Sequence, residues 1–571
     1  MPARSSALQW IAIPLLAAST AAATALSAQA QPGEPPQPAE TTESDGQIEA
    51  PVPELDWQSC GEGLEHFLCA TAEVPTDYDD PAGPTTSIAL TKLPATEPDS
   101  RIGTLFTNPG GPGGSGVEFV HTMGTMAFTD DVRQHFDILG FDPRGVAGSD
   151  PATCYRTLND ELEATASLPA FPVTDTEERR YQSTSIRLSV NCRMTSRERF
   201  EHASTANVAR DMDLLRQAVG DDQLTYMGYS YGTFLGATYA KLFPDQVRAL
   251  ALDGAIVPED YAGEPGEESA TVGERLKQGP GASATFAEFL RLCADAGPQR
   301  CALAALGDPE TVVNDTFEWL RTEPAEIQMP DGSTITVTYA TAVTLTFQNL
   351  YEPAGWAAHA ELLAQLATED AELSDEAGAL VERSLPDPSD RRRRGEDYDS
   401  VGSALASVCT DTGTTGDPFS YAERADAADE KAPHFGRFRA WTGLNCEYMR
   451  ITDDDAYTGP WEQDVDSPVL VIGTRFDPAT PYESTQPYAD HFPDAHILTV
   501  DGWGHTILNK SSCADEAVGA YLVELETPEE GSTCPQDITP FAGGPSTLDE
   551  QAPQVPRIPL PQLTTPATTS E

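Results

Sequence analysis

The chain has 571 residues, which is long enough to bury a large core in one or several domains. Its 34 Lys and Arg face 91 Asp and Glu, and the resulting net charge of −57 argues against nucleic acids and anionic membranes as partners. We interpret this acidity as a solvated surface that keeps the protein in solution, and adaptation to high salt is the alternative.

The first thirty residues have the features of a secretory signal peptide. Arg4 supplies a positive charge, residues 10–18 form a short apolar run, and Ala28 and Ala30 form a small-x-small cleavage motif. We expect cleavage near Ala30, so that a secreted mature chain begins near Gln31. No cysteine follows the apolar run to carry a lipid anchor, and no later stretch has the roughly 18 apolar residues of a membrane span.

Composition divides the remainder of the chain into segments. Residues 31–54 are rich in Pro, Glu, Thr and Gln, and residues 541–571 are similarly poor in large apolar groups. Both are predicted to be disordered flanks. Between them we predict one core in two parts, residues 55–254 and 442–540, separated by a mainly helical insertion, residues 255–441.

Short apolar runs bounded by Gly, Pro or Asp predict the strands of a buried parallel sheet. The runs are residues 101–107, 136–141, 224–228, 247–252, 469–473 and 497–500. Before the third run, Thr205 is expected to cap a helix that places Val208, Met212 and Leu215 on one face. Strands and helices therefore alternate, which predicts the α/β class with a doubly wound sheet.

The strand pattern stops between residues 255 and 441. Segments 284–294 and 356–367 have helical periodicity instead, and an inserted helical lid is the simplest explanation. Four consecutive arginines, residues 391–394, lie among Asp, Pro and Gly. We therefore expect an exposed turn that is open to proteolysis there, rather than a binding patch.

The ten cysteines fit an oxidising, extracellular compartment. Many pairings are open to ten cysteines, but their spacing suggests a local scheme in which each bridge closes one loop. The suggested pairs are Cys60 with Cys69, Cys154 with Cys192, Cys293 with Cys301, Cys409 with Cys446, and Cys513 with Cys534. A zinc site is disfavoured and no metal is expected, since the chain has neither Cys-x-x-Cys nor His-Glu-x-x-His.

Residues 228–232, Gly-Tyr-Ser-Tyr-Gly, follow a predicted strand and precede a helical segment, residues 233–242. This is the setting of a nucleophile elbow, where small neighbours permit a tight turn that presents a strained serine to substrate. A plain glycine-rich turn could carry the same letters, so the strand and helix around them favour the functional interpretation. Ser230 is therefore the candidate nucleophile of an α/β-hydrolase fold.

A second glycine-rich loop, residues 108–116, follows the first predicted strand. In this fold such a loop supplies an oxyanion donor, and glycine lets a backbone amide approach the oxyanion closely. We assign the two donors to the amides of Gly111 and Tyr231. The loop also contains the Gly-x-Gly-x-x-Gly spelling of a dinucleotide site, but Pro112 within it and the elbow downstream argue against a nucleotide.

A serine nucleophile needs a base, and the base needs an acid that orients it. Asp477 and His505 each lie just past a predicted strand, and the order Ser, Asp, His is the one this fold uses. Asp253 is the rival acid, but a helical insertion follows it directly, so Asp477 is preferred. Acyl transfer by Ser230, His505 and Asp477 requires no metal and no organic cofactor.

As a set, these motifs resemble the secreted tripeptidyl aminopeptidases of actinobacteria, which are relatives of prolyl aminopeptidases. The resemblance covers most of residues 55–540 and rests on residues 108–116, 142–145 (Asp-Pro-Arg-Gly) and 228–232, the Asp477 turn and the His505 loop. It implies an exopeptidase with an α/β-hydrolase core, a helical lid and a C-terminal, TAP-like segment that bears the acid and the histidine. Pro109 stands where prolyl aminopeptidases carry His, which weakens any transfer of their proline preference.

We therefore expect a secreted, monomeric serine exopeptidase that releases short peptides, such as tripeptides, from the free N-termini of peptide substrates. Glu352 is the candidate carboxylate for the substrate's α-ammonium, because charge pairing in a desolvated pocket discriminates well. A secreted carboxylesterase is the alternative, since fold and triad do not separate esters from amides. A non-catalytic binding protein is disfavoured because all three candidate triad residues are present.

Overall fold

The computed structural model describes residues 50–166, 168–263, 270–329, 332–368, 375–384 and 401–542. The expected signal peptide, the arginine run at 391–394, and most of the two predicted flanks lie outside these residues. Within the described ranges, no helix combines the length and the apolar character that crossing a bilayer requires.

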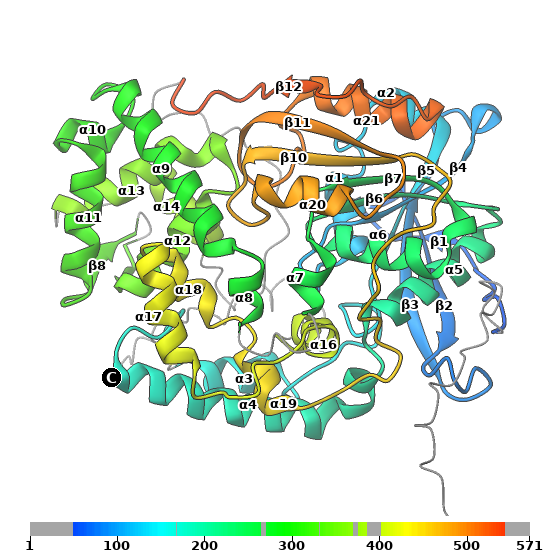
Figure 1. Ribbon diagram of the computed structural model, residues 1–571, viewed down its shortest axis with the longest axis horizontal. Helices are drawn as coiled ribbons and strands as arrows, with labels where there is room; N and C mark the ends of the chain where they lie inside the picture. The colour runs from blue at the N-terminus through cyan, green and yellow to red at the C-terminus, as the bar shows by residue number, and fades with distance from the viewer. Residues whose placement is uncertain are drawn as a thin grey trace, which may run out of the picture. The chain divides into compact units, whose positions relative to one another are not determined.

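Twelve strands are present in the described residues, and ten of them form one mixed sheet (Figure 1). They are β1 (Gln58–Ser59), β2 (Leu68–Pro75), β3 (Thr85–Leu93), β4 (Gly103–Asn108), β5 (Phe136–Phe141), β6 (Leu224–Tyr229), β7 (Val247–Asp253), β8 (Ala325–Gln328), β9 (Thr334–Val337), β10 (Val469–Phe476), β11 (Ala495–Trp503) and β12 (Thr533–Pro535). The sheet order is β1-β2-β3-β5-β4-β6-β7-β10-β11-β12, and β8 pairs separately with β9. From β5 to β12 all neighbours are parallel, whereas β1, β2 and β3 join antiparallel at one edge.

The helices connect these strands and build the insertion. They are α1 (Gly116–Met123), α2 (Asp130–His135), α3 (Leu158–Thr165), α4 (Asp175–Glu201), α5 (Thr205–Val219), α6 (Tyr231–Leu242), α7 (Pro258–Ala262), α8 (Val272–Arg275), α9 (Gln278–Ala296), α10 (Ala302–Leu306), α11 (Pro309–Leu320), α12 (Tyr339–Asn349), α13 (Trp356–Thr368), α14 (Asp375–Ser384), α16 (Val401–Asp411), α17 (Tyr421–Lys431), α18 (Phe435–Ala440), α19 (Leu444–Met449), α20 (Thr485–Ala489) and α21 (Ser512–Glu524). Four 3₁₀ turns complete the set: η1 (Pro98–Ser100), η2 (Pro244–Gln246), η3 (Pro353–Gly355) and η4 (Tyr482–Ser484).

Buried side chains of the central strands alternate between the two faces of the sheet. On β6, Leu224 and Tyr226 pack in the cluster that includes residues of α5 and α6. Met227 and Tyr229 of the same strand pack in the cluster that includes residues of α1, α2 and α21. Each central strand therefore serves two apolar layers, which explains why these strands are continuous apolar runs in the sequence.

All six predicted strands are strands in the structure, and residues 136–141 have the predicted bounds as β5. The antiparallel strands β2 and β3 were not predicted. The predicted cap of α5 is wrong by one residue: Thr205 is the first helical residue, and Ser204 is the cap, whose side chain accepts from the Asn207 amide. Both residues can cap, and the extended backbone of Ser204 decides between them.

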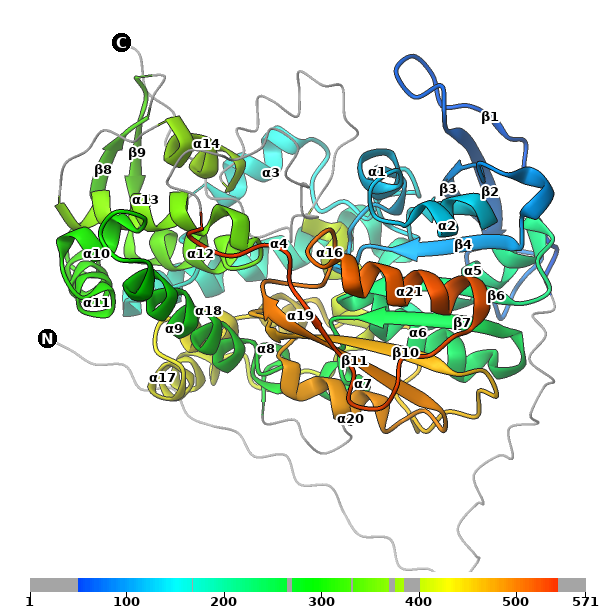
Figure 2. The ribbon, with the colours of Figure 1, turned by 90° about the horizontal axis from the view of Figure 1, so that it is seen from above.

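The insertion is largely helical, with the β8–β9 hairpin within it, and Figure 2 shows helices α9 to α13 gathered beside the sheet. It has its own apolar cluster, which includes Phe286, Phe317 and Trp356. Tyr181 of α4 belongs to this cluster too, so the unpredicted segment between β5 and α5 extends the helical part. Phe541, assigned to the disordered tail, is buried, and its ring centroid lies 5.8 Å from that of Phe289.

Five disulfides join the ten cysteines. They are the local pairs that the spacing suggests: Cys60–Cys69, Cys154–Cys192, Cys293–Cys301, Cys409–Cys446 and Cys513–Cys534. Each bridge closes a loop of 8 to 38 residues. Such bonds fit a protein that works in an oxidising compartment.

Candidate active site

Ser230 lies in the sharp turn between β6 and α6. Its backbone has φ 56° and ψ −121°, which a non-glycine residue holds only when its surroundings enforce it. The surroundings do so here, because the Ser230 amide donates to the backbone carbonyl oxygen of Asp253 at 2.8 Å. A Cβ added to Gly228 would lie 2.4 Å from the Gly232 oxygen, so the turn closes only with small residues on both sides.

His505 and Asp477 form a buried pair at the carboxyl end of the sheet. His505 Nδ1 lies 3.0 and 2.9 Å from the two carboxylate oxygens of Asp477. Both residues follow neighbouring parallel strands, Asp477 directly after β10 and His505 two residues after β11. The pairing fixes the ring with Nδ1 toward the acid and leaves Nε2 available for proton transfer.

The Asp477 carboxylate is surrounded by hydrogen-bond donors. One oxygen accepts from the amides of Ala479 and Thr480, and the other accepts from the Thr480 hydroxyl and the Thr506 amide. Burial raises the pKa of Asp477, but the charge of His505 and these hydrogen bonds outweigh it and hold the pKa below its usual value. The carboxylate is therefore charged across the physiological pH range and can stabilise an imidazolium.

Asp253, the rival acid, also ends a strand and is fully buried. One of its oxygens accepts from the Ile507 amide at 2.8 Å, and the other has no hydrogen-bond partner in the described structure. Burial raises the pKa of Asp253 to about 8, against the lowering effect of the Ile507 amide. The structure therefore pairs the histidine with Asp477 and leaves Asp253 as a neutral carboxylic acid at pH 7.

Ser230 and His505 both contact the Asp253–Gly254 segment. The Ser230 amide donates to the backbone oxygen of Asp253. A Cβ added to Gly254, the next residue, would lie 3.5 Å from His505 Cε1. Among the described residues, no hydrogen bond joins the Ser230 hydroxyl to the His505 ring. Catalytic hydrogen bonds are often long before substrate binds, so this arrangement is compatible with a triad.

Of the two proposed oxyanion donors, Tyr231 directly follows Ser230, and Gly111 belongs to a loop that touches Ser230 through Gly110. The Tyr231 amide is the first of α6, where helix amides have no intrahelical acceptor and attract negative charge. In the glycine loop the Gly110 amide donates to the Asn108 side chain at 2.9 Å, while no acceptor in the described residues binds the Gly111 amide. A Cβ at Gly110 would lie 2.9 Å from the Ser230 Cβ, so the loop touches the nucleophile directly.

Buried hydrogen bonds hold the Tyr231 side chain. Its hydroxyl is hydrogen-bonded to the Thr205 hydroxyl, which donates to Asp411 Oδ2 at 2.6 Å. Burial raises the pKa of Asp411 to about 7, and the hydrogen bonds from Thr205 lower it in part. This network connects the residue after the nucleophile to the end of α16 in the helical insertion.

The glycine loop is held at its C-terminal end and contacts the insertion in its middle. Asp142 accepts from the Ser115 hydroxyl and the Val117 amide, which fixes the start of α1 at the end of the loop. On its outer side the loop touches the insertion, since a Cβ on Gly113 would lie 2.9 Å from the Ala404 amide nitrogen of α16. Both contacts require the loop to stay in one conformation, as an oxyanion site needs.

The insertion also contacts the histidine itself. The His505 amide donates to the backbone carbonyl oxygen of Tyr351 at 3.1 Å. The rings of the two residues also meet edge to face, with centroids 4.8 Å apart. A Cβ on Gly504 would lie 2.5 Å from that same oxygen, so glycine is required where the two segments meet. The turn after α12 therefore covers the histidine.

Glu352 lies in this turn, one residue from the histidine contact. It caps η3 through the Ala354 amide, and its carboxylate lies 3.8 Å from the buried Lys510 ammonium. Lys510 also donates to the His505 oxygen at 3.0 Å. The predicted amine-binding carboxylate is thus brought to the site, already beside one cation.

Three contributors to the site were missed in the sequence. Thr480 had a usable signal, because a Thr three residues after an Asp in a loop often bonds back to it. Tyr351 had none, because only the tertiary fold brings its carbonyl to His505, and Lys510 lies five residues after His505 but matches no motif that predicts its bond to the His505 backbone oxygen.

Comparison with known proteins places these features in context. Residues 103–289 match the alpha/beta hydrolase fold family, and residues 432–534 match the TAP-like protein family. Serine protease Hip1 of Mycobacterium tuberculosis is 33% identical over 490 residues, which cover 82% of this chain and 87% of that protein. Tripeptidyl aminopeptidase of Streptomyces lividans is 27% identical over 495 residues, covering 85% and 87%. Carboxylesterase B of M. tuberculosis is 32% identical over 510 residues, covering 85% and 91%.

Proposed function

This chain belongs to the TAP-like family of α/β-hydrolase serine hydrolases, and from that premise we propose that it is an exported exopeptidase. In this proposal it removes short peptides, tripeptides among them, from the free N-termini of peptide substrates. The names of its relatives include both a peptidase and a carboxylesterase, so the choice between amide and ester substrates depends on the site.

The proposed mechanism is acyl transfer. The Ser230 oxygen attacks the scissile carbonyl carbon while His505 Nε2 takes the hydroxyl proton, and Asp477 stabilises the resulting imidazolium. The amides of Gly111 and Tyr231 bind the carbonyl oxygen as it becomes negative. The C–N bond then breaks, His505 returns the proton to the leaving amine, and water releases the N-terminal fragment from Ser230 by the same steps.

The observation that carries the peptidase proposal is the turn that covers His505. Tyr351 and Glu352 belong to the inserted lid. They contact the His505 loop through the Tyr351 backbone oxygen and the Glu352 carboxylate. A lid held over the histidine limits the length of substrate that fits ahead of the scissile bond. That restriction suits an exopeptidase better than an enzyme that cleaves within long chains.

Glu352 is the proposed partner of the substrate ammonium. One of its carboxylate oxygens is buried without a hydrogen-bond partner in the described structure, so it can accept from an ammonium without breaking an existing bond. Lys510 lies 3.8 Å from that oxygen and reduces the net charge of the subsite. The attraction therefore depends on the direct hydrogen bond rather than on the long-range field.

The test uses peptides of graded length with free or acetylated N-termini, together with short-chain esters. We expect release of short N-terminal fragments from the free peptides and a loss of at least about 100-fold in kcat/KM after acetylation, which removes the charge. Equal cleavage of free and blocked peptides, or activity confined to esters, would instead support the carboxylesterase.

A variant separates substrate binding from structural support at the same position. Glu352→Gln should raise KM for free peptides by roughly tenfold or more, yet change the turnover of a short ester little, since the ester has no ammonium. Glu318→Gln, an exposed lid residue of α11, is the matched control. Equal losses on both substrates would mean that Glu352 serves only to hold Lys510 and the His505 loop.

Export is the second part of the proposal. It is supported by the five disulfides and by the signal-like residues 1–30. N-terminal sequencing of protein recovered from the culture medium should find a chain that begins near Gln31, and size-exclusion chromatography should find a monomer. Retention of the full-length chain inside the cells would argue against export.

A further inference from the structure

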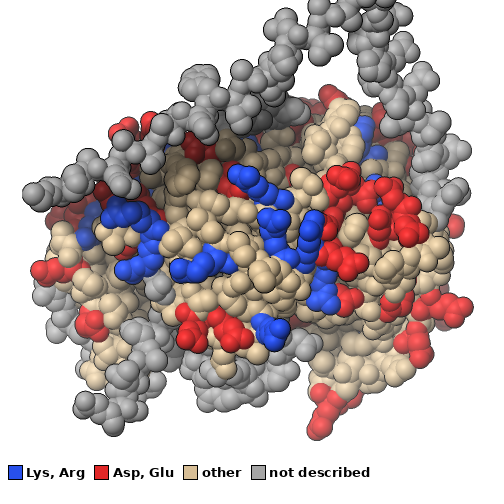
Figure 3. Space-filling view, turned by 90° about the horizontal axis from the view of Figure 1, so that it is seen from below, with Lys and Arg blue, Asp and Glu red and all other residues tan. Residues whose placement is uncertain are grey.

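Helix α4 differs in charge from the rest of the chain. Residues 179–197 contain five arginines and no acidic residue, in a chain whose net charge is −57. The five arginines are exposed: Arg179, Arg180, Arg187, Arg193 and Arg197. Figure 1 shows α4 along one edge of the described chain, and Figure 3, which views that side, shows a band of Lys and Arg across it. Residues 179–197 are therefore a local basic surface on an acidic protein, whereas the two ends of α4 carry acidic residues: Asp175, Glu177, Glu178, Glu198 and Glu201.

The same helix exposes large apolar side chains. Ile186, Val190 and Met194 are 42%, 46% and 80% exposed, and their spacing of four residues places them in one stripe. Phe419, which is 73% exposed, follows Pro418, whose backbone oxygen accepts from the Gln182 side chain of α4, one turn before Ile186. These four are half of the eight large apolar residues exposed in the described structure. Such a concentration usually marks a binding surface.

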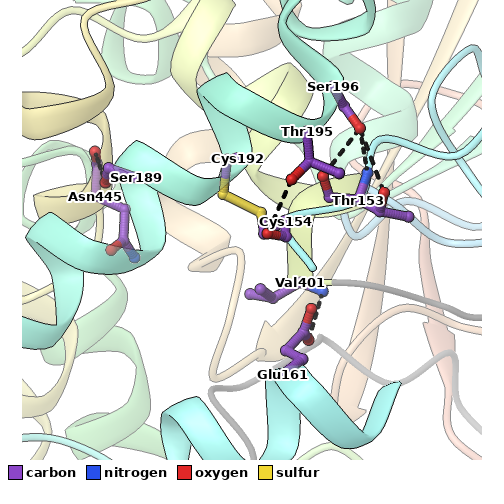
Figure 4. Close-up of a disulfide and its surroundings, with 9 residues drawn as sticks. All are labelled: Thr153, Cys154, Glu161, Ser189, Cys192, Thr195, Ser196, Val401 and Asn445. Atoms are coloured by element: carbon purple, nitrogen blue, oxygen red, sulfur yellow. Dashed lines mark hydrogen bonds between the residues drawn. A yellow bond between two sulfur atoms is a disulfide. The ribbon is translucent and has the colours of Figure 1, made fainter. Parts of the chain in front are cut away.

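The opposite face of α4 is fixed to the protein (Figure 4). Cys192 is bonded to Cys154, Ser189 donates to the Asn445 oxygen at 2.9 Å, and Ser196 exchanges hydrogen bonds with Thr153 at 3.1 and 2.9 Å. These attachments lie one or two residues from Val190 and Met194. They prevent the helix from turning its apolar stripe inward.

We propose that this outer face of α4, residues 179–197 with Phe419, docks the protein on the surface of an anionic phospholipid bilayer. The aliphatic side chains and Phe419 would enter the boundary between headgroups and acyl chains. The arginines on both sides of the stripe would bind lipid phosphates, as basic residues do in helices that lie flat in a membrane interface. The docking is peripheral and reversible.

A second copy of this chain is a poorer occupant of the face. In a two-fold dimer each surface meets its own copy, so α4 against α4 would bring arginines against arginines. Among the described residues, no carboxylate lies within ion-pair distance of Arg187 or Arg193 to relieve that repulsion, although Arg197 pairs with Glu201. A soluble polyanion would satisfy the arginines but leaves the four apolar side chains without a partner.

The net charge of −57 argues by itself against an anionic membrane, and it limits such docking without preventing it, because the basic surface is local. At physiological salt, charges are screened beyond about 8 Å, so a bilayer in contact with α4 is affected mainly by the local arginines. In low salt the repulsion from the rest of the protein reaches further. Binding is therefore expected to depend on the apolar stripe and the arginines together.

The test is cosedimentation of the secreted chain with vesicles. Vesicles of phosphatidylglycerol and phosphatidylcholine should bind the protein at physiological salt, and vesicles of phosphatidylcholine alone should bind it much less. The variant R187Q/R193Q/R197Q should weaken binding to the anionic vesicles on the order of 100-fold. The variant I186S/V190S/M194S should weaken it about tenfold or more, because each lost side chain removes apolar area from the interface.

The control R291Q/R300Q/R475Q removes three exposed arginines elsewhere and should bind like the wild type. Thermal unfolding checks that each variant is folded, and Met194→Ser alone serves if the triple apolar variant is not. Failure of the wild type to bind anionic vesicles, or an equal loss in the control, would overturn the proposal. So would unchanged binding of the apolar variants, because the face would then be a site for soluble polyanions.

Discussion

Two aspartates end neighbouring strands of the sheet, and the structure gives them opposite states. Asp477 after β10 and Asp253 at the end of β7 are both buried, at 2% and 0% exposure. Asp477 accepts four hydrogen bonds besides its contact with His505 and is charged, whereas Asp253 accepts one and holds its proton to about pH 8. Position at a strand end therefore does not set the charge of an acid. The donors around the carboxylate decide it.

Removal of the proposed nucleophile or base should lower kcat the most, and the effects of the two aspartates are compared with that loss. Ser230→Ala and His505→Ala should each lower kcat by about 10⁶-fold, because either loss disables the same proton-transfer unit. Steady-state kinetics on a free peptide measures the loss, and circular dichroism should show that both variants are folded. A folded Ser230→Ala protein with substantial activity would rule out Ser230 as the nucleophile.

The aspartates themselves come next. Asp477→Asn should lose on the order of 10⁴-fold in kcat, because an amide cannot stabilise the imidazolium or hold the ring in the required tautomer. Asp253→Asn should lose far less, since it replaces a neutral acid by a neutral amide. The same kinetic assay compares them, and the opposite ranking would reverse the assignment of the acid.

The disulfide that follows the His505 loop tests whether this edge of the sheet contributes to stability alone or also positions His505. Cys513 of α21 is bonded to Cys534 of β12, a few residues beyond the His505 loop. Replacing both cysteines with serine should lower the free energy of unfolding by about 2 kcal/mol while leaving kcat within a fewfold. Urea unfolding measures the first quantity, with the lid bridge Cys293–Cys301 as the matched comparison. A collapse of kcat would show that the bridge also positions His505.

The last expected effect is a change in the pH dependence of stability rather than in catalysis. The raised pKa means that folded Asp253 keeps a proton that the unfolded chain releases, so this residue lowers stability as pH rises from about 4 to about 8. Asp253→Asn lacks this contribution, so its stability relative to the wild type should increase over that range, by at most about 1.4 kcal/mol per pH unit. Urea unfolding at pH 5 and pH 7 tests this. A constant difference would mean that Asp253 is charged.

The central sheet could be predicted because its strands serve two apolar layers. Residues 136–141, for example, are buried along their whole length as β5. In β2 the exposed residues Thr71 and Glu73 interrupt the apolar pattern, and β3 contains the polar residues Thr91 and Lys92, so a search for continuous runs passes over both strands. Helix α4 was missed for a related reason: its buried positions include Ser185 and Ser189, so its inner face is not an apolar stripe in the sequence.

The candidate site was predictable where its chemistry is local. The turn around Ser230 needs small neighbours, and the turn after β10 places Asp477 through hydrogen bonds to Ala479 and Thr480. The contacts of Tyr351 and Lys510 are different, because they join segments about 150 residues apart with no short-range pattern. Glu352 was chosen for its charge, and its proximity to Lys510 could not have been known from the sequence.

The hydrogen bond between the His505 amide and the backbone oxygen of Tyr351 has a consequence for protein engineering. It joins the lid to the His505 loop, so the lid is not an exchangeable module. A chimaera that takes its lid from a relative, in order to change substrate preference, would also replace the carbonyl and the ring that support the histidine. Such designs should transfer the turn at residues 350–355 together with the loop at residues 504–510, so that both sides of the contact come from one parent.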